Sequence, residues 1–275
     1  MLANTLSYVL NNPSSVIVET CMLVAALRWF CVPADRRRAE LLFVFSAICG
    51  PVSILFTGVL VALSFLCPVR YDFYIYGFSE SVMGLPSFRV AQIAETHLWF
   101  KELLGFSYSL FFGAIVVTLA VYLWVRTEEQ AIQVAKTFAL NCCAALGFYL
   151  ILPASGPRYA FPGFPHIPIQ QTMPHLAMIG GPPNCVPSVH MSNALLVFWF
   201  LRDWRWGRIA AGLFIILTAA ATLGTGEHYM FDLFCSVPYA AGVLWSIHGF
   251  DGMRTTDGLT EDAQLKAKAS RVALH

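Results

Sequence analysis

The sequence contains little charge. Asp, Glu, Lys and Arg make up only 12% of its 275 residues, whereas they make up about a quarter of a typical soluble domain. Hydrophobic residues account for 57%, and mean hydropathy over the whole length is +0.64. A chain of this composition cannot cover its surface with polar side chains. The composition therefore excludes a soluble globular enzyme, a disordered chain and a fibrous repeat, and it predicts a multi-span membrane protein.

The sequence also lacks a basic excess and any regular cysteine spacing. Its 17 Lys and Arg residues against 16 Asp and Glu residues give a formal net charge of +1, which provides no surface for nucleic acid. The eight cysteines show neither metal-ligand nor disulfide-framework spacing, so we interpret most of them as packing residues. Cys67 and Cys185 fall near loops expected on the same side, and a disulfide between them stays open as an alternative.

Long apolar runs, in contrast, are abundant. A transmembrane helix needs about 20 mostly apolar residues, and seven stretches are candidates: 14–33, 41–67, 105–125, 131–152, 187–203, 208–226 and 228–248. The first contains Glu19, so six and seven spans are both open. We expect an all-α integral membrane protein, built as a bundle of six or seven transmembrane helices. No basic residue precedes the first stretch, which argues against a secretory signal peptide.

The basic residues predict how these spans are oriented. If the first span starts outside, thirteen of the 17 basic residues fall on the cytoplasmic side, and the outer side keeps Arg70, Arg89, Lys101 and Arg158. Basic loops remain cytoplasmic in membrane proteins. We therefore expect a multi-pass protein of the cell membrane with its N-terminus outside and its C-terminus in the cytoplasm.

Two stretches between the spans are too long for simple loops. Residues 68–104 carry mostly apolar side chains at steps of three and four, at Val90, Ile93, His97, Phe100 and Leu104. This pattern predicts one helix lying in the outer interface. Residues 153–186 are rich in Pro and Gly and cannot form a continuous helix. A structured loop of that length is more often functional than idle.

Ionisable groups occur in three short segments on the predicted outer side. The segments are Pro153–Tyr159, which contains Arg158, Cys185–His190 and Gly224–Asp232. Ionisable groups at helix mouths in so apolar a chain are costly and usually functional. The three segments together therefore mark the candidate site.

The second and third segments have residue spacings that predict their local geometry. Pro187 suits the first turn of a helix, which would place Ser188 and His190 beside free backbone N–H groups, where phosphate commonly binds. His228 and Asp232 are four residues apart, and we expect them to stack on one helix face. The carboxylate would then fix the imidazole tautomer and leave the other nitrogen free to attack. Arg158 upstream offers a planar cationic fork for phosphoryl oxygens.

These motifs resemble the type 2 phosphatidic acid phosphatase superfamily over about residues 70–248. The resemblance consists of Pro-Ser-X-His at 187–190, His-X-X-X-Asp at 228–232 and the upstream Arg158. The departures are similar to the inositol phosphorylceramide synthase branch: Ile151 replaces the family's Lys, Val189 replaces a Gly and Thr222 replaces an Arg. Sphingomyelin synthases resemble that branch in sharing the His-Tyr-X-X-Asp pattern.

The resemblance implies a lipid phosphotransferase that works through a phosphohistidine. His228, oriented by Asp232, would be the nucleophile, His190 the general acid and base, and Arg158 and Ser188 the phosphate-binding residues. The expected partners are the bilayer, a phospholipid donor, and a lipid alcohol or water as acceptor. No cofactor or metal is implied, and the sequence offers no outward cluster of carboxylates to hold Mg²⁺.

The resemblance also predicts how the chain is divided. We expect N-terminal spans and the interfacial helix in 1–104, the catalytic membrane core in 105–250 and a cytoplasmic tail in 251–275. Two other functions stay open. A lipid phosphate phosphatase, acting on phosphatidate or an isoprenoid phosphate, would use the same histidines with water as acceptor. An anion transporter would bind with these groups and perform no chemistry, although the sequence lacks the internal repeats usual in transporters.

Overall fold

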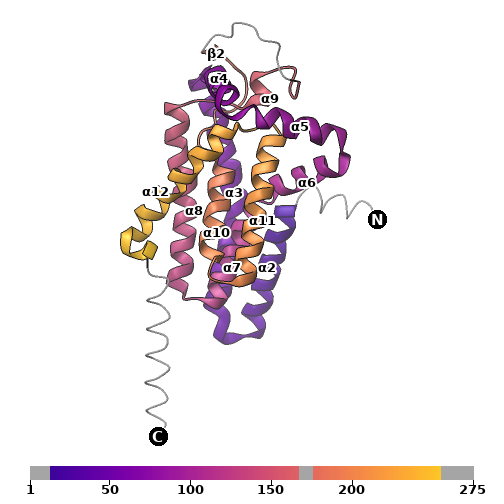
Figure 1. Ribbon diagram of the computed structural model, residues 1–275. Coiled ribbons are helices and arrows are strands. Elements are labelled where there is room, and N and C mark those ends of the chain that lie inside the picture. The colour runs from indigo at the N-terminus through magenta and orange to yellow at the C-terminus, as the bar shows by residue number, and fades with distance from the viewer. Residues whose placement is uncertain (1–12, 167–175, 255–275) are drawn as a thin grey trace.

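The computed structural model describes residues 13–166 and 176–254 and is almost entirely helical. Long helices run side by side, and the short helices α4, α5 and α9 gather with the strands at one end (Figure 1). We call this end the cap. The long helices and their bounds are α2 (Pro13–Cys31), α3 (Arg36–Leu66), α7 (Phe111–Val125), α8 (Glu128–Ile151), α10 (Val189–Leu201), α11 (Arg205–Gly224) and α12 (Met230–Arg254). A short 3₁₀ helix, η1 (Pro33–Asp35), joins α2 to α3.

These helices confirm the predicted fold class, an all-α integral membrane protein. Five helical units in the described residues are long and apolar enough to cross a bilayer: Pro13–Cys31, Pro33–Leu66, Glu128–Ile151, Arg205–Gly224 and Met230–Gly249. A sixth results if α6 (Leu98–Ser109) and α7, which meet at 53°, form one bent span, and α10 is a shorter apolar helix. The bend follows Ser109, whose hydroxyl donates to the carbonyls of Gly105 and Phe106, a contact that often bends helices.

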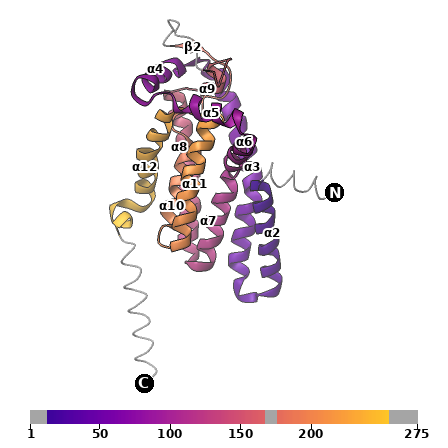
Figure 2. The ribbon, with the colours of Figure 1, turned by 45° about the vertical axis from the view of Figure 1, so that its right-hand side comes forward.

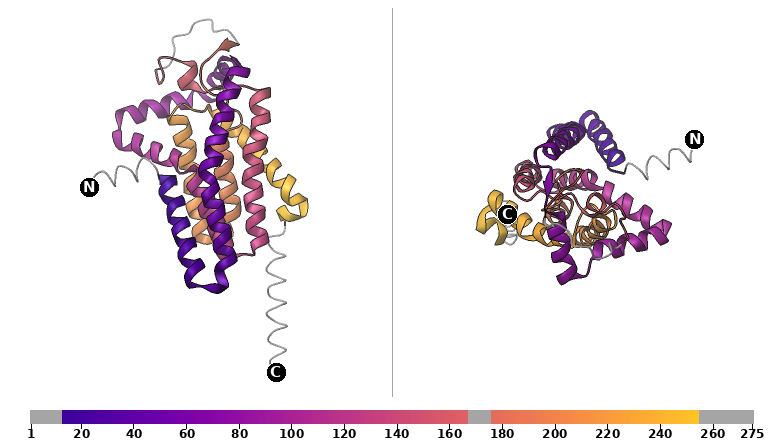
Figure 3. Two further views of the ribbon diagram at one scale, coloured as in Figure 1. Left: turned by 180° about the vertical axis from the view of Figure 1, so that it is seen from behind. Right: turned by 90° about the horizontal axis from the view of Figure 1, so that it is seen from above.

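Apolar side chains lie both inside the bundle and on its outer surface. The interior cluster draws on α7, α8, α10, α11 and α12 through Leu119, Val134, Leu196, Ala211 and Leu244. On the outside, large residues such as Ile54 and Phe65 of α3 are exposed, as expected where a helix faces lipid. The α2–α3 pair lies along one side of the bundle (Figures 2 and 3).

The prediction of one interfacial helix over 68–104 is wrong, because the stretch is divided into shorter helices. The chain forms three short helices there, α4 (Asp72–Met83), α5 (Pro86–Thr96) and α6. Gly84 and Leu85 both have positive φ, 71° and 59°, and Pro86 cannot donate a helical hydrogen bond, so the helix must end and restart. A second break falls at His97, which is extended.

The cap joins segments that are distant in the sequence. Strand β1 (Val69–Arg70) pairs antiparallel with β2 (Ala177–Met178), and the described parts of 153–186 are otherwise irregular except for α9 (Pro157–Ala160). Arg70 is fully buried and donates to Ser155 Oγ at 3.1 Å and to the Gly181 carbonyl at 3.2 Å. It therefore fastens the strand pair to the segment that carries Arg158.

Two other predictions concern the cysteines and the tail. All eight cysteines lie in the described residues and are free, so the alternative of a Cys67–Cys185 disulfide is wrong. The two residues also differ in burial. Cys185 is buried beside the third motif segment, whereas Cys67 is half-buried at the end of α3. Most of the tail predicted for 251–275 lies outside the described residues, and the three-part division of the chain stays a prediction.

Candidate active site

The Cys185–His190 segment opens helix α10. Ser188 is the N-cap residue of this helix, and its hydroxyl accepts the Met191 N–H at 3.3 Å. Pro187 therefore precedes the cap instead of lying in the first turn, because the Ser188 hydroxyl is the better cap. Ser188 is fully buried, and its carbonyl accepts from Ser236 of α12 at 3.0 Å. This bond holds the start of α10 against α12.

His228 lies in the loop between α11 and α12. The prediction that it stacks with Asp232 on one helix face is wrong in detail, since α12 begins at Met230. Its backbone is fixed instead by loop contacts: the His228 N–H donates to the Thr222 carbonyl at 3.2 Å, and the His228 carbonyl accepts from Ser87 Oγ of α5 at 2.9 Å. Asp232 is in the first turn of α12, where its Oδ2 accepts the Tyr229 N–H at 2.7 Å.

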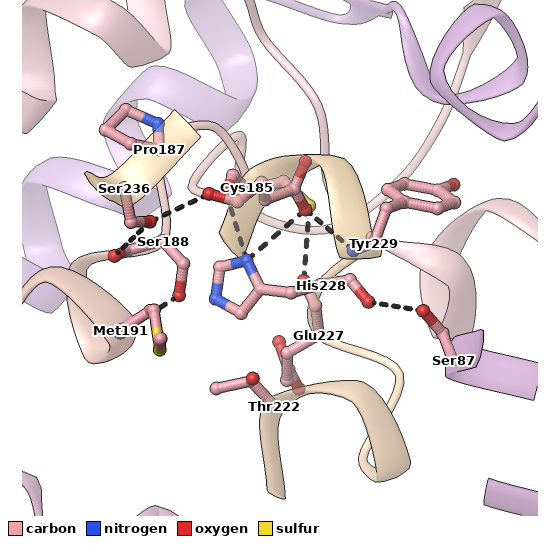
Figure 4. A network of polar contacts seen from close by, with 12 residues as sticks. Ser87, Cys185, Pro187, Ser188, Met191, Thr222, Glu227, His228, Tyr229 and Ser236 are labelled. Atoms are coloured by element: carbon pink, nitrogen blue, oxygen red, sulfur yellow. Dashed lines mark hydrogen bonds and ion pairs between the residues drawn. The ribbon is translucent and has the colours of Figure 1, made fainter. Parts of the chain in front are cut away.

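The His228 ring has two acceptors on the same side. Its Nδ1 is 3.0 Å from the Cys185 carbonyl oxygen and 3.5 Å from Asp232 Oδ2 (Figure 4). Both acceptors favour a proton on Nδ1, which leaves the Nε2 lone pair free. The side chains of His228 and Asp232 are 2% and 0% exposed, so this arrangement is shielded from solvent. The predicted contact between the two side chains exists, and a backbone carbonyl supplements it.

Cys185 also belongs to the site. The sequence did not indicate this role, because most cysteines were interpreted as packing residues. The Cys185 thiol donates to Asp232 Oδ2 at 2.6 Å and lies 3.3 Å from the Glu227 carbonyl. Burial raises the pKa of the Cys185 thiol well above its usual range, so the thiol remains protonated and can donate. Cys185, His228 and Asp232 also place three possible metal-ligand atoms within 4.8 Å of one another. A metal there would need a thiolate, which burial opposes.

His190 faces His228 from the first turn of α10. The centroids of the two rings are 6.2 Å apart. Two aromatic rings hold His190 in place: Tyr108 of α6 stacks on it with centroids 4.2 Å apart, and Phe111 of α7 is 4.6 Å away. Neither aromatic belongs to a motif segment, and no signal in the sequence marked them.

Arg158 reaches the same place from α9. The Arg158 side chain is about half exposed, and its Nη1 is 2.8 Å from Glu227 Oε1. Its backbone N–H donates to the Gly226 carbonyl at 2.9 Å. Gly156, with φ +98°, lies so close to the next loop that a Cβ atom there would meet the Glu227 carbonyl oxygen at 2.3 Å. The first and third motif segments are thus in direct backbone contact.

Asp72, at the start of α4, joins these two segments. Its carboxylate accepts the N–H groups of Ser155 and Gly156, the closest at 2.7 Å, and the Tyr229 hydroxyl at 3.1 Å. The residue is fully buried, and burial raises the pKa of its carboxyl to about 6. No local signal in the sequence indicated this role, because the partners are far along the chain.

Comparison with known proteins decides the family. A family model described as the PAP2 superfamily, where PAP2 denotes type 2 phosphatidic acid phosphatase, matches residues 75–246. This range is more than half of the chain and includes all three motif segments. The chain belongs to the PAP2 superfamily. No curated protein and no solved structure was found to match. PAP2 superfamily members are generally phosphatases or phosphotransferases, so this chain is an enzyme of that type.

The two positions at which the resemblance implies missing cations differ in their surroundings within this PAP2 chain. Ile151 is 76% exposed and lies at the end of α8. Thr222 is fully buried, and its hydroxyl donates to the Thr218 and Ala219 carbonyls of its own helix. Neither side chain can attract a phosphate. The motif segments therefore bring Arg158 to the site as their cation, beside the Glu227 carboxylate.

Proposed function

We propose that this chain is a lipid phosphotransferase of the membrane that works through a phosphohistidine on His228. One observation carries the proposal: His190 and His228 face each other, and acceptors on one side of His228 leave its Nε2 free. A nucleophile with an oriented base and a second histidine opposite is the minimum needed for a two-step transfer. The superfamily supports the reaction type, and these contacts support the roles.

The first step breaks the bond between the donor's phosphorus and its leaving oxygen. His228 Nε2 attacks phosphorus in line, and the electron pair leaves on the lipid alkoxide. Protonated His190 gives its proton to that alkoxide, so the leaving lipid departs as a neutral alcohol. Asp232 and the Cys185 carbonyl balance the positive charge that develops on the His228 ring.

The second step returns the enzyme to its starting state. Neutral His190 takes the proton of the acceptor hydroxyl, and the acceptor oxygen attacks the phosphohistidine. The bond between nitrogen and phosphorus breaks, and its electron pair returns to His228 Nε2. Arg158, Ser188 and the N–H groups at the start of α10 would stabilise the equatorial oxygens during both steps.

The membrane setting favours a lipid on both sides of the reaction. A phospholipid donor can enter sideways with its chains in the bilayer while its headgroup reaches the three motif segments. We place this end of the bundle on the extracytoplasmic face, with the C-terminus of α12 at the cytoplasmic face of the cell membrane, because the basic loops would then remain inside. Without the family's Lys and the third motif's Arg, the site fits a singly charged phosphodiester, as in inositolphosphotransferases.

The test compares membranes that contain the wild-type chain, His228→Ala or His97→Ala. His97 is an exposed histidine at the junction of α5 and α6, so its variant is the matched control. Each membrane receives fluorescent ceramide or diacylglycerol with a phospholipid donor, and separately a lipid phosphate. We expect a new fluorescent phospholipid from wild type and control, and none from His228→Ala. Loss of His190 should lower turnover by roughly 10²–10⁴-fold.

The other outcomes are equally informative. Release of inorganic phosphate with no new phospholipid would identify a lipid phosphate phosphatase that uses the same histidines. Equal products from wild type and His228→Ala would overturn the phosphohistidine. A labelled phosphoenzyme, trapped from wild type and absent from His228→Ala, would confirm the covalent step directly. Binding of the anions without turnover by any chain would favour the transporter.

A further inference from the structure

The guanidinium of Arg158 already has an anionic partner. Arg158 Nη1 is 2.8 Å from Glu227 Oε1, and the Tyr159 hydroxyl lies 3.4 Å from the same oxygen. The two ends of this ion pair differ in accessibility, because the Arg158 side chain is 52% exposed whereas that of Glu227 is 10% exposed. The cation is therefore open to an arriving substrate while the carboxylate lies behind it.

The loop holds Glu227 firmly in this position. Gly226 has φ +74°, and a Cβ there would meet the Phe164 ring at 2.6 Å. On the other side, the Glu227 carbonyl lies against Gly156 and 3.3 Å from the Cys185 thiol. Glu227 also directly precedes His228, so the carboxylate is attached to the same rigid loop as the nucleophile.

Arg158 is the cation paired with this carboxylate, and the side chains at two nearby motif-related positions add no further positive charge. Neither Ile151, at the end of α8, nor Thr222, whose carbonyl accepts the His228 N–H, carries charge. Arg70, a fully buried cation of the cap, donates to Ser155 and to the Gly181 carbonyl instead. A phosphoryl group bound at Arg158 thus meets a fixed negative charge within a few ångströms.

We propose that Glu227 is a specificity-determining residue that selects substrates by the charge on their phosphoryl group. A phosphodiester carries one negative charge, which Arg158 can hold while it remains paired with Glu227. A phosphomonoester carries close to two, and its second charge is repelled by the carboxylate. Two unit charges about 4 Å apart interact strongly at a partly buried site. The substrate class of this site is therefore a phosphodiester lipid, and this inference rests on the proposed function.

The deciding variant is Glu227→Gln, which keeps the size of the side chain and removes the charge. The measurement is kcat/KM on a phosphodiester phospholipid and on a lipid phosphate in the same detergent micelles. We expect the monoester-to-diester ratio to rise about tenfold or more in Glu227→Gln. Glu227→Asp, which keeps the charge, should stay nearer the wild-type ratio. Glu95→Gln, on an exposed position of α5, is the control and should leave the ratio unchanged.

A second measurement needs only the wild-type chain and covers the case in which Glu227→Gln fails to fold. Two inhibitors of equal chain length are compared: an alkyl phosphonic acid with two ionisable oxygens and its methyl ester with one. We expect the methyl ester to inhibit at about tenfold lower concentration. Equal inhibition, or an unchanged ratio in Glu227→Gln, would overturn the charge selection. Equal turnover by wild type and His228→Ala would instead overturn the proposed function. The two failures are therefore distinguishable.

Discussion

Tyr108 stacks on His190, with ring centroids 4.2 Å apart and an angle of 24° between the planes. Tyr108 comes from α6, a helix without any of the motif residues, and also lies beside Leu104 in a small apolar cluster. Helix α6 thereby supplies one wall of the site. Stacking restricts the rotation of the imidazole and so keeps its reactive nitrogen toward the place where the leaving oxygen must lie.

This stacking predicts a difference between two substitutions at Tyr108. Tyr108→Phe keeps the ring and should retain most of the turnover, whereas Tyr108→Leu removes the aromatic face and should lower kcat roughly tenfold with a small change in KM. The measurement is steady-state turnover of a fluorescent lipid acceptor by the two purified variants. If Phe and Leu cause equal losses, the hydroxyl and not the ring is what positions the site.

A second prediction concerns Cys185, because its thiol contacts Asp232 whereas its carbonyl contacts His228. Cys185→Ala removes the donor to Asp232 and keeps the carbonyl that faces His228, so the rate of phosphoenzyme formation should fall about tenfold. Cys185→Ser restores a donor and should recover much of that loss. Cys235→Ala is the control, because Cys235 lies on α12 three residues after Asp232. Rapid-quench trapping of the phosphoenzyme gives the rates, and a Cys185→Ala rate equal to that of wild type would contradict this role.

The same thiol should resist alkylation. It is fully buried, and burial raises its pKa, so little thiolate exists near neutral pH. A maleimide should therefore label Cys31, which is exposed at the end of α2, while activity persists. Rapid inactivation that is absent from Cys185→Ser would show instead that the site opens during turnover.

Asp72 predicts a dependence of stability on pH. Burial raises the pKa of this carboxyl from 3.8 to about 6, so the folded chain holds the proton more tightly than the unfolded chain does. The resulting stabilisation is fully present below about pH 4 and is lost as pH rises to about 6, and it amounts to about 3 kcal/mol. The amide of Asp72→Asn is neutral at every pH, like the protonated carboxyl. The stability of wild type relative to this variant should therefore decrease across the same pH window.

Unfolding in detergent micelles between pH 4 and pH 7 tests this relation. The other titrating groups are common to both chains and cancel in the difference. If the stability of wild type relative to Asp72→Asn instead increases with pH, the hydrogen bonds from Ser155, Gly156 and Tyr229 outweigh the cost of burying the charge. Asp72→Asn should in addition weaken the joint between the first and third motif segments, because it places an amide group among backbone donors.

The features that the sequence predicted are those that local patterns encode. Hydropathy located most of the long apolar helices, and the order of Arg158, His190 and His228 located the candidate site, because each signal is confined to a short stretch of chain. The break at Gly84 and Pro86 was also present locally, but the apolar repeat that continued to Leu104 concealed it. Helix-face stacking of His228 with Asp232 was wrong for a similar reason, since spacing alone does not show where a helix begins.

The features that the sequence did not predict depend on contacts between distant segments. Cys185 bonds to Asp232 across 47 residues, and Tyr229 bonds to Asp72 across 157. Tyr108 lies in an apolar stretch that resembles any other part of the bundle. A thiol, a tyrosine and the buried Asp72 carboxylate carry no motif of their own, so only the folded chain shows that they support the same candidate site.

The near-contact between Gly156 and the Glu227 carbonyl has a consequence for how this enzyme can diversify. A side chain at position 156 would collide with the backbone beside the nucleophile, so a substitution of Gly156 requires the Glu227 loop to move with it. Helix α6 meets the site through side chains such as Tyr108, so a substitution there need not move the histidine loops. New headgroup preferences in descendants of this chain should therefore accumulate on α6 while the histidine loops stay nearly constant.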